Sequence, residues 1–289
     1  MRKFLCAALL IMPLISFSQK LLFLQDKVKG QIDFVNENHL DVYTIINQGQ
    51  FVTNDLLDEK KLRNEIVRCF PSTSATGYAV LDWEGKAMEA LISQKDNKAL
   101  KLYIEQFVKA LKIAKQLRPR VKWAFYALPY RQYWNINEVY SKRNYNLAKI
   151  IKTQDFIAPS LYIFYPVESA KKGNSEYIKK NVGLALEMGR RYKKPVYPFI
   201  WHRVHPSNKE YGEKLVDIDV FEEAIFQITN VTYNGGKIAG LIWWHAENFS
   251  YLNRAKSNVF LKEYAHVSDP NKYQKNMFQL YYNRIKKHL

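Results

Sequence analysis

Residues 77–84 have the sequence Gly-Tyr-Ala-Val-Leu-Asp-Trp-Glu, an apolar run that ends in two carboxylates. A continuous apolar run is typical of a strand that is covered on both faces of a parallel sheet. Successive side chains of a strand point to opposite faces, so Asp82 and Glu84 should project the same way, about 7 Å apart along the strand. We therefore predict a parallel strand at 77–82 that presents two acids together at its carboxyl end.

Similar apolar runs recur on both sides of this stretch and predict strands at 20–24, 41–46, 122–128, 156–162, 196–201 and 238–244, of which the first is the weakest. Helical periodicity predicts helices at 96–117, 175–192 and 218–230, and a final helix in 269–289 that packs back on the sheet. Asp58 and Ser175 are expected to be helix N-caps, and Lys194-Pro195 and Gly235-Gly236 to separate helix from strand.

Alternating strands and helices predict an α/β protein, and we expect a single distorted TIM-like (β/α) barrel of about seven strands. An open doubly wound sheet is the alternative. No glycine-rich phosphate loop follows any of these strands, which argues against a nucleotide-binding fold. A chain of 289 residues can bury one large core, and no linker divides it, so residues 19–289 are predicted to form one catalytic domain.

In a β/α barrel the active site lies at the carboxyl ends of the strands, where Asp82 and Glu84 are expected. Two acids facing one cavity suit the cleavage of a glycosidic bond. One carboxyl must be protonated to donate to the leaving oxygen, and a charged neighbour helps to keep it so. The spacing is equally compatible with a second interpretation, in which both acids only cap the following helix.

Aromatic and polar side chains stand at the other predicted strand ends: Tyr126 and Tyr130, Tyr162, Trp201 with His202 and Arg203, and Trp243 with Trp244. Taken singly, each suits core packing. A barrel would bring all of them around one cleft, however, and sugars pack their flat faces on aromatic rings. Together they indicate a sugar-binding site.

Four segments resemble, in order, the blocks of the hyaluronidases, glycoside hydrolase family 56. They are Asp82-Trp83-Glu84, Trp123-Ala124-Phe125-Tyr126-Ala127-Leu128-Pro129, Pro159-Ser160-Leu161-Tyr162 and Gly240-Leu241-Ile242-Trp243-Trp244. The resemblance extends over residues 41–248. It departs from the animal pattern at residues 85–87, where Gly-Lys-Ala replaces Trp-Arg-Pro, and at residues 130–135, where the family has a block with Cys-Tyr-Asn. The family's disulfides are also missing, and these departures leave the exact polymer open.

The resemblance implies retaining, substrate-assisted hydrolysis of β-linked N-acetylhexosaminides. Glu84 would be the general acid and then the base, and Asp82 would hold the 2-acetamido group, whose carbonyl oxygen attacks the anomeric carbon. Tyr126 and Tyr162 match tyrosines that bind the acetamido sugar, and Trp244 matches the aromatic residue that walls its methyl group. No protein nucleophile, metal or cofactor is implied.

The first 18 residues have the pattern of a secretory signal peptide. Arg2 and Lys3 precede an apolar stretch, and Ser16-Phe17-Ser18 is a small-residue cleavage site. No later stretch is apolar enough over a membrane length, so we expect a secreted or periplasmic protein without a transmembrane segment. A leader without further cysteine pairs suggests a bacterial member of the family.

The chain carries 44 basic and 27 acidic residues, a net charge of +17 that falls by two if the leader is removed. Such a field attracts polyanions. No basic-aromatic nucleic-acid motif is present, so the expected partner is an anionic polysaccharide, not a nucleic acid. The alternative is a basic surface that is merely solvated.

Other residues admit two interpretations. Arg203 is a candidate for binding a uronate carboxylate, since a planar guanidinium pairs well with one, but it would equally suit a structural ion pair. Glu247 and Asn248 either line the cleft or cap a helix. His202, His205 and His245 lack the helical spacing of a zinc site, so no metal is expected. Cys69 is expected to be a buried apolar residue, not a nucleophile.

The sequence thus predicts an endo-β-N-acetylhexosaminidase of hyaluronidase type that acts on hyaluronan or chondroitin. The enzyme alternative is a barrel hydrolase for another N-acetylated polymer such as chitin. The other alternative is a carbohydrate-binding barrel without turnover. Linkage, product length and oligomeric state do not follow from the sequence.

Overall fold

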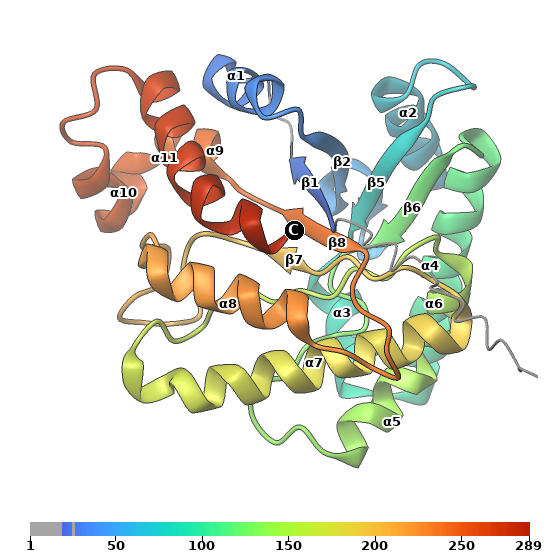
Figure 1. The fold of residues 1–289 in the computed structure, drawn as a ribbon. Helices are drawn as coiled ribbons and strands as arrows, with labels where there is room; N and C mark the ends of the chain where they lie inside the picture. Colours follow the sequence, from blue (N-terminus) through green and yellow to red (C-terminus); the bar gives the residue numbers. More distant parts are fainter. Residues whose placement is uncertain (1–18, 25–26) are drawn as a thin grey trace, which may run out of the picture.

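The computed structural model describes residues 19–24 and 27–289 and places a curled parallel sheet at the centre, with helices around it (Figure 1). The sheet has six strands in the order β6-β5-β2-β1-β8-β7, and each neighbouring pair is parallel. Its strands are β1 (Lys20–Leu24), β2 (Asp41–Asn47), β5 (Gly77–Asp82), β6 (Val121–Phe125), β7 (Phe199–Ile200) and β8 (Gly240–Trp243). A separate antiparallel pair joins β3 (Val52–Thr53) and β4 (Leu56–Leu57). The α/β class and the barrel-like fold are confirmed.

Helices lie in the connections between strands, and three more follow the last strand. The α-helices are α1 (Lys29–Glu37), α2 (Glu59–Cys69), α3 (Gly85–Ser93), α4 (Asn97–Leu117), α5 (Glu138–Asn146), α6 (Ala148–Thr153), α7 (Lys171–Tyr192), α8 (Ile218–Asn230), α9 (Glu247–Leu252), α10 (Asn258–Glu263) and α11 (Pro270–Ile285). The final helix α11 packs against α1 and α8, as expected of the tail (Figure 1). Asp58 caps α2 through its side chain, but Ser175 is not an N-cap, because α7 begins four residues earlier.

One of the seven predicted strands, residues 156–162, forms isolated bridges instead of a regular strand. On one side the Asp155 amide donates to the Trp123 carbonyl at 2.7 Å, and on the other the Tyr197 amide donates to the Ile157 carbonyl at 2.8 Å. This segment therefore lies between β6 and the β7 end of the sheet and links its two edges. β6, β7 and β8 are also shorter than the predicted strands 122–128, 196–201 and 238–244.

Alternation along the strands divides the apolar side chains into two sets. Leu22, Val80, Ala124 and Ile242 belong to a core inside the barrel. Their neighbours along the strands face the helices and join a larger outer core: Leu21, Phe23, Ala79, Leu81, Trp123, Phe125, Leu241 and Trp243. This parity fixes which side chains can reach the interior at the carboxyl ends of the strands.

Candidate active site

A pocket of about 170 Å³ lies at the carboxyl ends of the strands. Asp82 and Glu84 continue the inward positions of β5, and Trp244 continues those of β8. The residues that line the pocket are Ile45, Asp82, Glu84, Tyr126, Tyr162, Trp201, His205, Pro206 and Trp244. We call this cavity the carboxylate pocket. The structure thus brings Asp82 and Glu84 to one pocket with four of the aromatic residues named from the sequence: Tyr126, Tyr162, Trp201 and Trp244.

Asp82 ends β5 with one carboxylate oxygen buried. Burial, and then the neighbouring charge of Glu84, raise the pKa of Asp82 to about 7. Among the described residues, Asp82 Oδ1 has no hydrogen-bond partner, and neither do the buried Tyr43 hydroxyl and Trp201 Nε1. Buried polar groups in folded proteins are usually paired, so unpaired groups in and around a pocket are candidates for contacts with a ligand.

Glu84 occupies the N-cap position of α3, but its side chain accepts no capping hydrogen bond. Its backbone amide instead donates to Gln48 Oε1 at 3.0 Å. Trp83, between the two acids, points outward and stacks on Phe107 with ring centroids 4.8 Å apart. The exposed Glu84 carboxylate therefore lines the pocket and does not cap α3, contrary to the helix-capping interpretation.

Aromatic rings form one wall of the carboxylate pocket. Tyr162 stacks on Trp244 at 5.8 Å and lies 6.1 Å from the ring of Tyr126. The Tyr126 hydroxyl donates to Ser160 Oγ at 3.1 Å. Trp201 meets Trp244 edge to face at 4.8 Å. These contacts hold the rings in fixed orientations, as a site for a flat sugar face requires.

Sequence reasoning missed a charged group behind this wall. Arg131 Nη2 lies 2.8 Å from His205 Nε2, and the guanidinium lies 5.5 Å from the Tyr162 ring centroid. Burial and then the positive charge of Arg131 lower the pKa of His205 to about 4, so this histidine is neutral near pH 7. Because a guanidinium only donates, His205 Nε2 accepts from Arg131, while His205 Nδ1 lies 2.7 Å from Ser207 Oγ and 3.2 Å from the Ser207 backbone nitrogen. No spacing rule would have found this pair, because it joins residues 74 positions apart.

Tyr130 does not line the carboxylate pocket, contrary to the sequence-based expectation. It is buried, with its ring edge-on to Tyr140 at 5.5 Å. Its amide donates to Asn144 Oδ1 at 2.9 Å. The physical reason is that β6 ends at Phe125, so strand alternation no longer determines where residue 130 points.

Arg203 also lies outside the lining of the pocket, and a substrate carboxylate cannot reach it. Its side chain is fully buried and donates to Glu247 at 2.5 and 2.7 Å and to Glu263 at 2.7 Å. Burial alone would raise the pKa of Glu247, but Arg203 holds it well below the usual range. Of the two interpretations of Arg203, the structural ion pair is the one observed. Glu247 shares in it, and so neither lines the cleft nor acts as the N-cap of α9.

We expect Arg203→Met to destabilise the fold by about 3 kcal/mol or more, because it leaves two carboxylates buried without their cation. Urea unfolding would measure the loss. Arg284→Met is the matched control: Arg284 also binds two acids, Asp219 and Glu222, but is partly exposed, so its loss should cost about 1 kcal/mol or less. Equal effects of the two substitutions would contradict the structural role.

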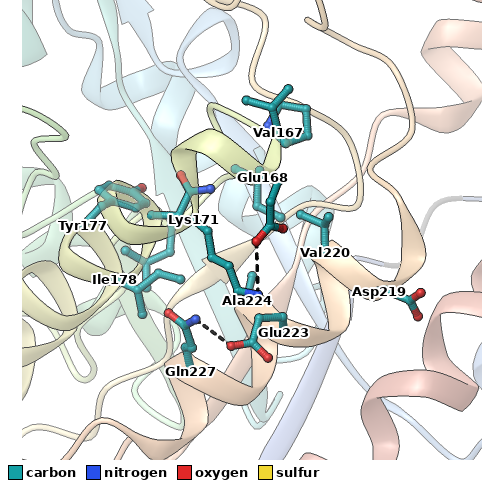
Figure 2. A pocket seen from close by; sticks show the side chains of 14 residues that line it. Val167, Glu168, Lys171, Tyr177, Ile178, Asp219, Val220, Glu223, Ala224 and Gln227 are labelled. Atoms are coloured by element: carbon teal, nitrogen blue, oxygen red, sulfur yellow. Dashed lines mark hydrogen bonds and ion pairs between the residues drawn. The ribbon is translucent and has the colours of Figure 1, made fainter.

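A larger pocket, of about 310 Å³, lies between the start of α7 and α8 (Figure 2). Its floor is apolar, with Leu161, Ile163 and Ile178 among the lining residues. Its polar rim is already paired: Lys171 lies 3.5 Å from Glu168, and Gln227 donates to Glu223 at 2.7 Å (Figure 2). Neither Asp82 nor Glu84 lines this larger pocket, so the smaller carboxylate pocket remains the candidate active site.

Within residues 19–24 and 27–289, no group of three or more His, Cys, Asp or Glu is arranged to hold a metal ion. His202 bonds to Glu247 and Trp243, and His245 bonds to the Leu24 carbonyl. Cys69 is half-buried at the end of α2, and burial raises the pKa of its thiol to about 11. Over the same part of the chain, no helix is long and apolar enough to cross a membrane. The expected leader lies outside the described residues.

No protein-family model matches the chain. Two curated relatives match about half of it. Hyaluronidase Tab y 2.0101 of Tabanus yao is 28% identical over 144 residues, which cover 46% of this chain and 41% of the relative. A hyaluronidase of Apis mellifera is 24% identical over 130 residues, which cover 42% and 33%. The matches therefore span less than half of either relative's length. Both relatives are from insects, and a bacterial source stays a prediction.

The crystal structure of bee venom hyaluronidase is similar over nearly the whole chain. It superposes with a TM-score of 0.64 at 16% identity and covers 93% of this chain and 99% of its own. The complex of that enzyme with a hyaluronic acid tetramer gives a TM-score of 0.61 at 15% identity, covering 90% and 99%. The chain thus has a hyaluronidase-like barrel fold, and the sequence matches over about half of its length support kinship with the hyaluronidase family.

Proposed function

We propose that this protein is an exported glycoside hydrolase that cleaves a β-linked N-acetylhexosamine polysaccharide. The observation that carries the proposal is that the carboxylates of Asp82 and Glu84 line one aromatic-walled pocket at the carboxyl ends of the strands. The kinship with hyaluronidases supports the same class of reaction. Residues 19–289 would form the single catalytic domain, after a cleaved leader of 18 residues.

In the proposed mechanism Glu84 protonates the leaving oxygen and then removes a proton from the attacking water. Its exposed side chain, without a capping bond, suits both steps. Asp82 would accept a hydrogen bond from the acetamido N–H, so that the carbonyl oxygen attacks the anomeric carbon. The ring formed by that attack is cationic, and a carboxylate beside it lowers the barrier.

The aromatic wall supplies the contacts of the proposed sugar site. Tyr126 and Tyr162 would bind the acetamido sugar, and Trp244 would pack on its methyl group. The unpaired Trp201 Nε1 is a further donor for a sugar hydroxyl. The positive charge of the chain supports an anionic glycosaminoglycan, hyaluronan or chondroitin, as the substrate.

A panel of hyaluronan, chondroitin and chitin oligosaccharides tests the proposal through the release of new reducing ends. We expect the wild-type protein to cleave hyaluronan or chondroitin, with internal bonds broken first. Cleavage of chitin alone would identify a hydrolase for a neutral polymer. Binding of one of these glycans without any cleavage would instead identify a carbohydrate-binding barrel.

A further inference from the structure

We propose that Tyr133, Trp134 and Tyr165 form a second sugar-binding surface, which holds a unit of the same glycan outside the carboxylate pocket. We call these three residues the outer aromatic platform. The proposal rests on the proposed function, because it assigns the platform to the same polysaccharide. It concerns a stretch in which this chain departs from the hyaluronidase pattern, residues 130–135.

The rings of the platform lie together on the surface. The side chain of Trp134 is 62% exposed, although tryptophan has the largest of the apolar side chains. Its ring lies 4.6 Å from Tyr133 and 6.0 Å from Tyr165, and Tyr133 lies 4.9 Å from Tyr165. Tyr133 and Tyr165 are half-buried, so the platform presents one exposed ring beside two that are partly open to solvent. An aromatic cluster at the surface is a candidate contact surface for a ligand.

Hydrogen bonds fix the Tyr133 side chain and the Tyr165 backbone of the platform. The Tyr133 hydroxyl donates to Asn174 Oδ1 at 2.9 Å, and Asn174 Nδ2 donates to the Tyr165 carbonyl at 2.8 Å. The Tyr133 hydroxyl lies so close to Gly173 that a Cβ there would be 2.9 Å from it. A preformed ring surface is favourable because little side-chain entropy is lost when a ligand binds.

Aromatic contacts connect the platform to the carboxylate pocket. Tyr133 lies 5.8 Å from Phe164, Phe164 lies 4.5 Å from His205, and His205 lies 6.3 Å from Tyr162. The Arg131 guanidinium lies over the Phe164 ring at 5.0 Å and also over Tyr162. A chain bound in the pocket could therefore continue along this row to reach the platform.

The chemistry around the rings favours a sugar. The amides of Gln132 and Asn174 lie beside them and already bond to backbone or side-chain oxygens of the same loops. Within the platform itself there is no charged side chain. Rings bordered by amides and hydroxyls suit a ligand with an apolar face and polar edges, which is how a pyranose ring presents itself.

The test compares Trp134→Ala with wild type on oligosaccharides of increasing length from the polymer that wild type cleaves. We expect KM for long chains to rise about threefold to tenfold, with kcat unchanged and short oligosaccharides unaffected. Trp134→Phe should restore most of the loss because it keeps a ring. Phe226→Ala is the matched control, since Phe226 is an exposed aromatic residue (45%) on α8 that is not part of the platform.

Two results would overturn the proposal. One is a KM for long chains that Trp134→Ala and Tyr165→Ala leave unchanged. The other is an equal change for short and long chains, which would indicate a general disturbance of the fold. A change in sedimentation of Trp134→Ala without a change in KM would assign the surface to self-association instead.

If wild type cleaves none of the panel, the proposed function fails, and the platform is then tested by binding. Isothermal titration of the same hyaluronan, chondroitin and chitin oligosaccharides with wild type and Trp134→Ala would measure it. If a long glycan binds wild type more tightly than Trp134→Ala, the platform is a sugar-binding surface although the protein is not a hydrolase. Equal affinity, or no binding to wild type, overturns the platform as well.

Discussion

Replacing Glu84 by glutamine is expected to lower kcat on the cleaved polysaccharide by about 10²- to 10⁴-fold, the range found for loss of a general acid. The amide has nearly the shape of the carboxyl group but cannot donate a proton to the leaving oxygen. KM should change little, because the residues that would bind the sugar remain. Release of reducing ends at saturating substrate gives kcat directly.

Glu89→Gln is the matched control for this experiment. Glu89 is an exposed acid on α3, the helix that begins immediately after Glu84, and it does not line the carboxylate pocket. Its substitution should leave kcat and the melting temperature unchanged. If Glu84→Gln retained a quarter or more of wild-type turnover, Glu84 would not be the proton donor.

Asp82→Asn is expected to lower kcat by about 10²- to 10³-fold, comparable with the loss of a group that stabilises charge in the transition state. The amide oxygen can still accept a hydrogen bond, but it has no negative charge to oppose the cationic intermediate. Circular dichroism should show an unchanged fold. Near-normal turnover of this variant would rule out the role assigned to Asp82.

The pH profile provides a second test of the acid pair. Burial and the adjacent charge of Glu84 raise the pKa of Asp82 to about 7, so Asp82 carries its proton in acidic solution. The proposed role of Asp82 needs the carboxylate, and kcat/KM of wild type should therefore rise as pH increases towards about 7. Asparagine does not ionise, so the residual activity of Asp82→Asn should lack this rise. A rise with the same midpoint in Asp82→Asn would contradict the assignment of this titration to Asp82.

The same carboxyl makes stability depend on pH. An aspartate whose pKa rises from 3.8 to about 7 on folding binds more protons in the folded state between these values. Its contribution to the free energy of unfolding therefore decreases as pH rises from about 4 to about 7. Asp82→Asn removes the cost of the buried charge, so we expect its melting temperature to exceed that of wild type at pH 8 and the difference to shrink at pH 4. A lower melting temperature than wild type at pH 8 would be evidence against a destabilising charge at this position.

The local sequence determined most of the strands and the position of the acids. The apolar run of residues 77–82 predicts β5 with the same bounds. A strand that is covered on both faces is apolar along most of its length, because side chains on either face are buried. The spacing of Asp82 and Glu84 predicts a shared direction, because strand geometry sends every second side chain to the same face. Trp244 was predictable for the same reason, as the next inward position after Ile242.

Tertiary structure alone decided what lies beyond the ends of the strands. The alternation of side chains ends where a strand ends. The sequence therefore could not show that Tyr130 turns into the core or that Arg203 forms ion pairs with Glu247 and Glu263. The pairing of Arg131 with His205 was equally hidden, because it depends on how two loops far apart in the chain meet above the barrel. Periodicity carries information only within a regular element, whereas contacts between loops depend on the closure of the whole sheet.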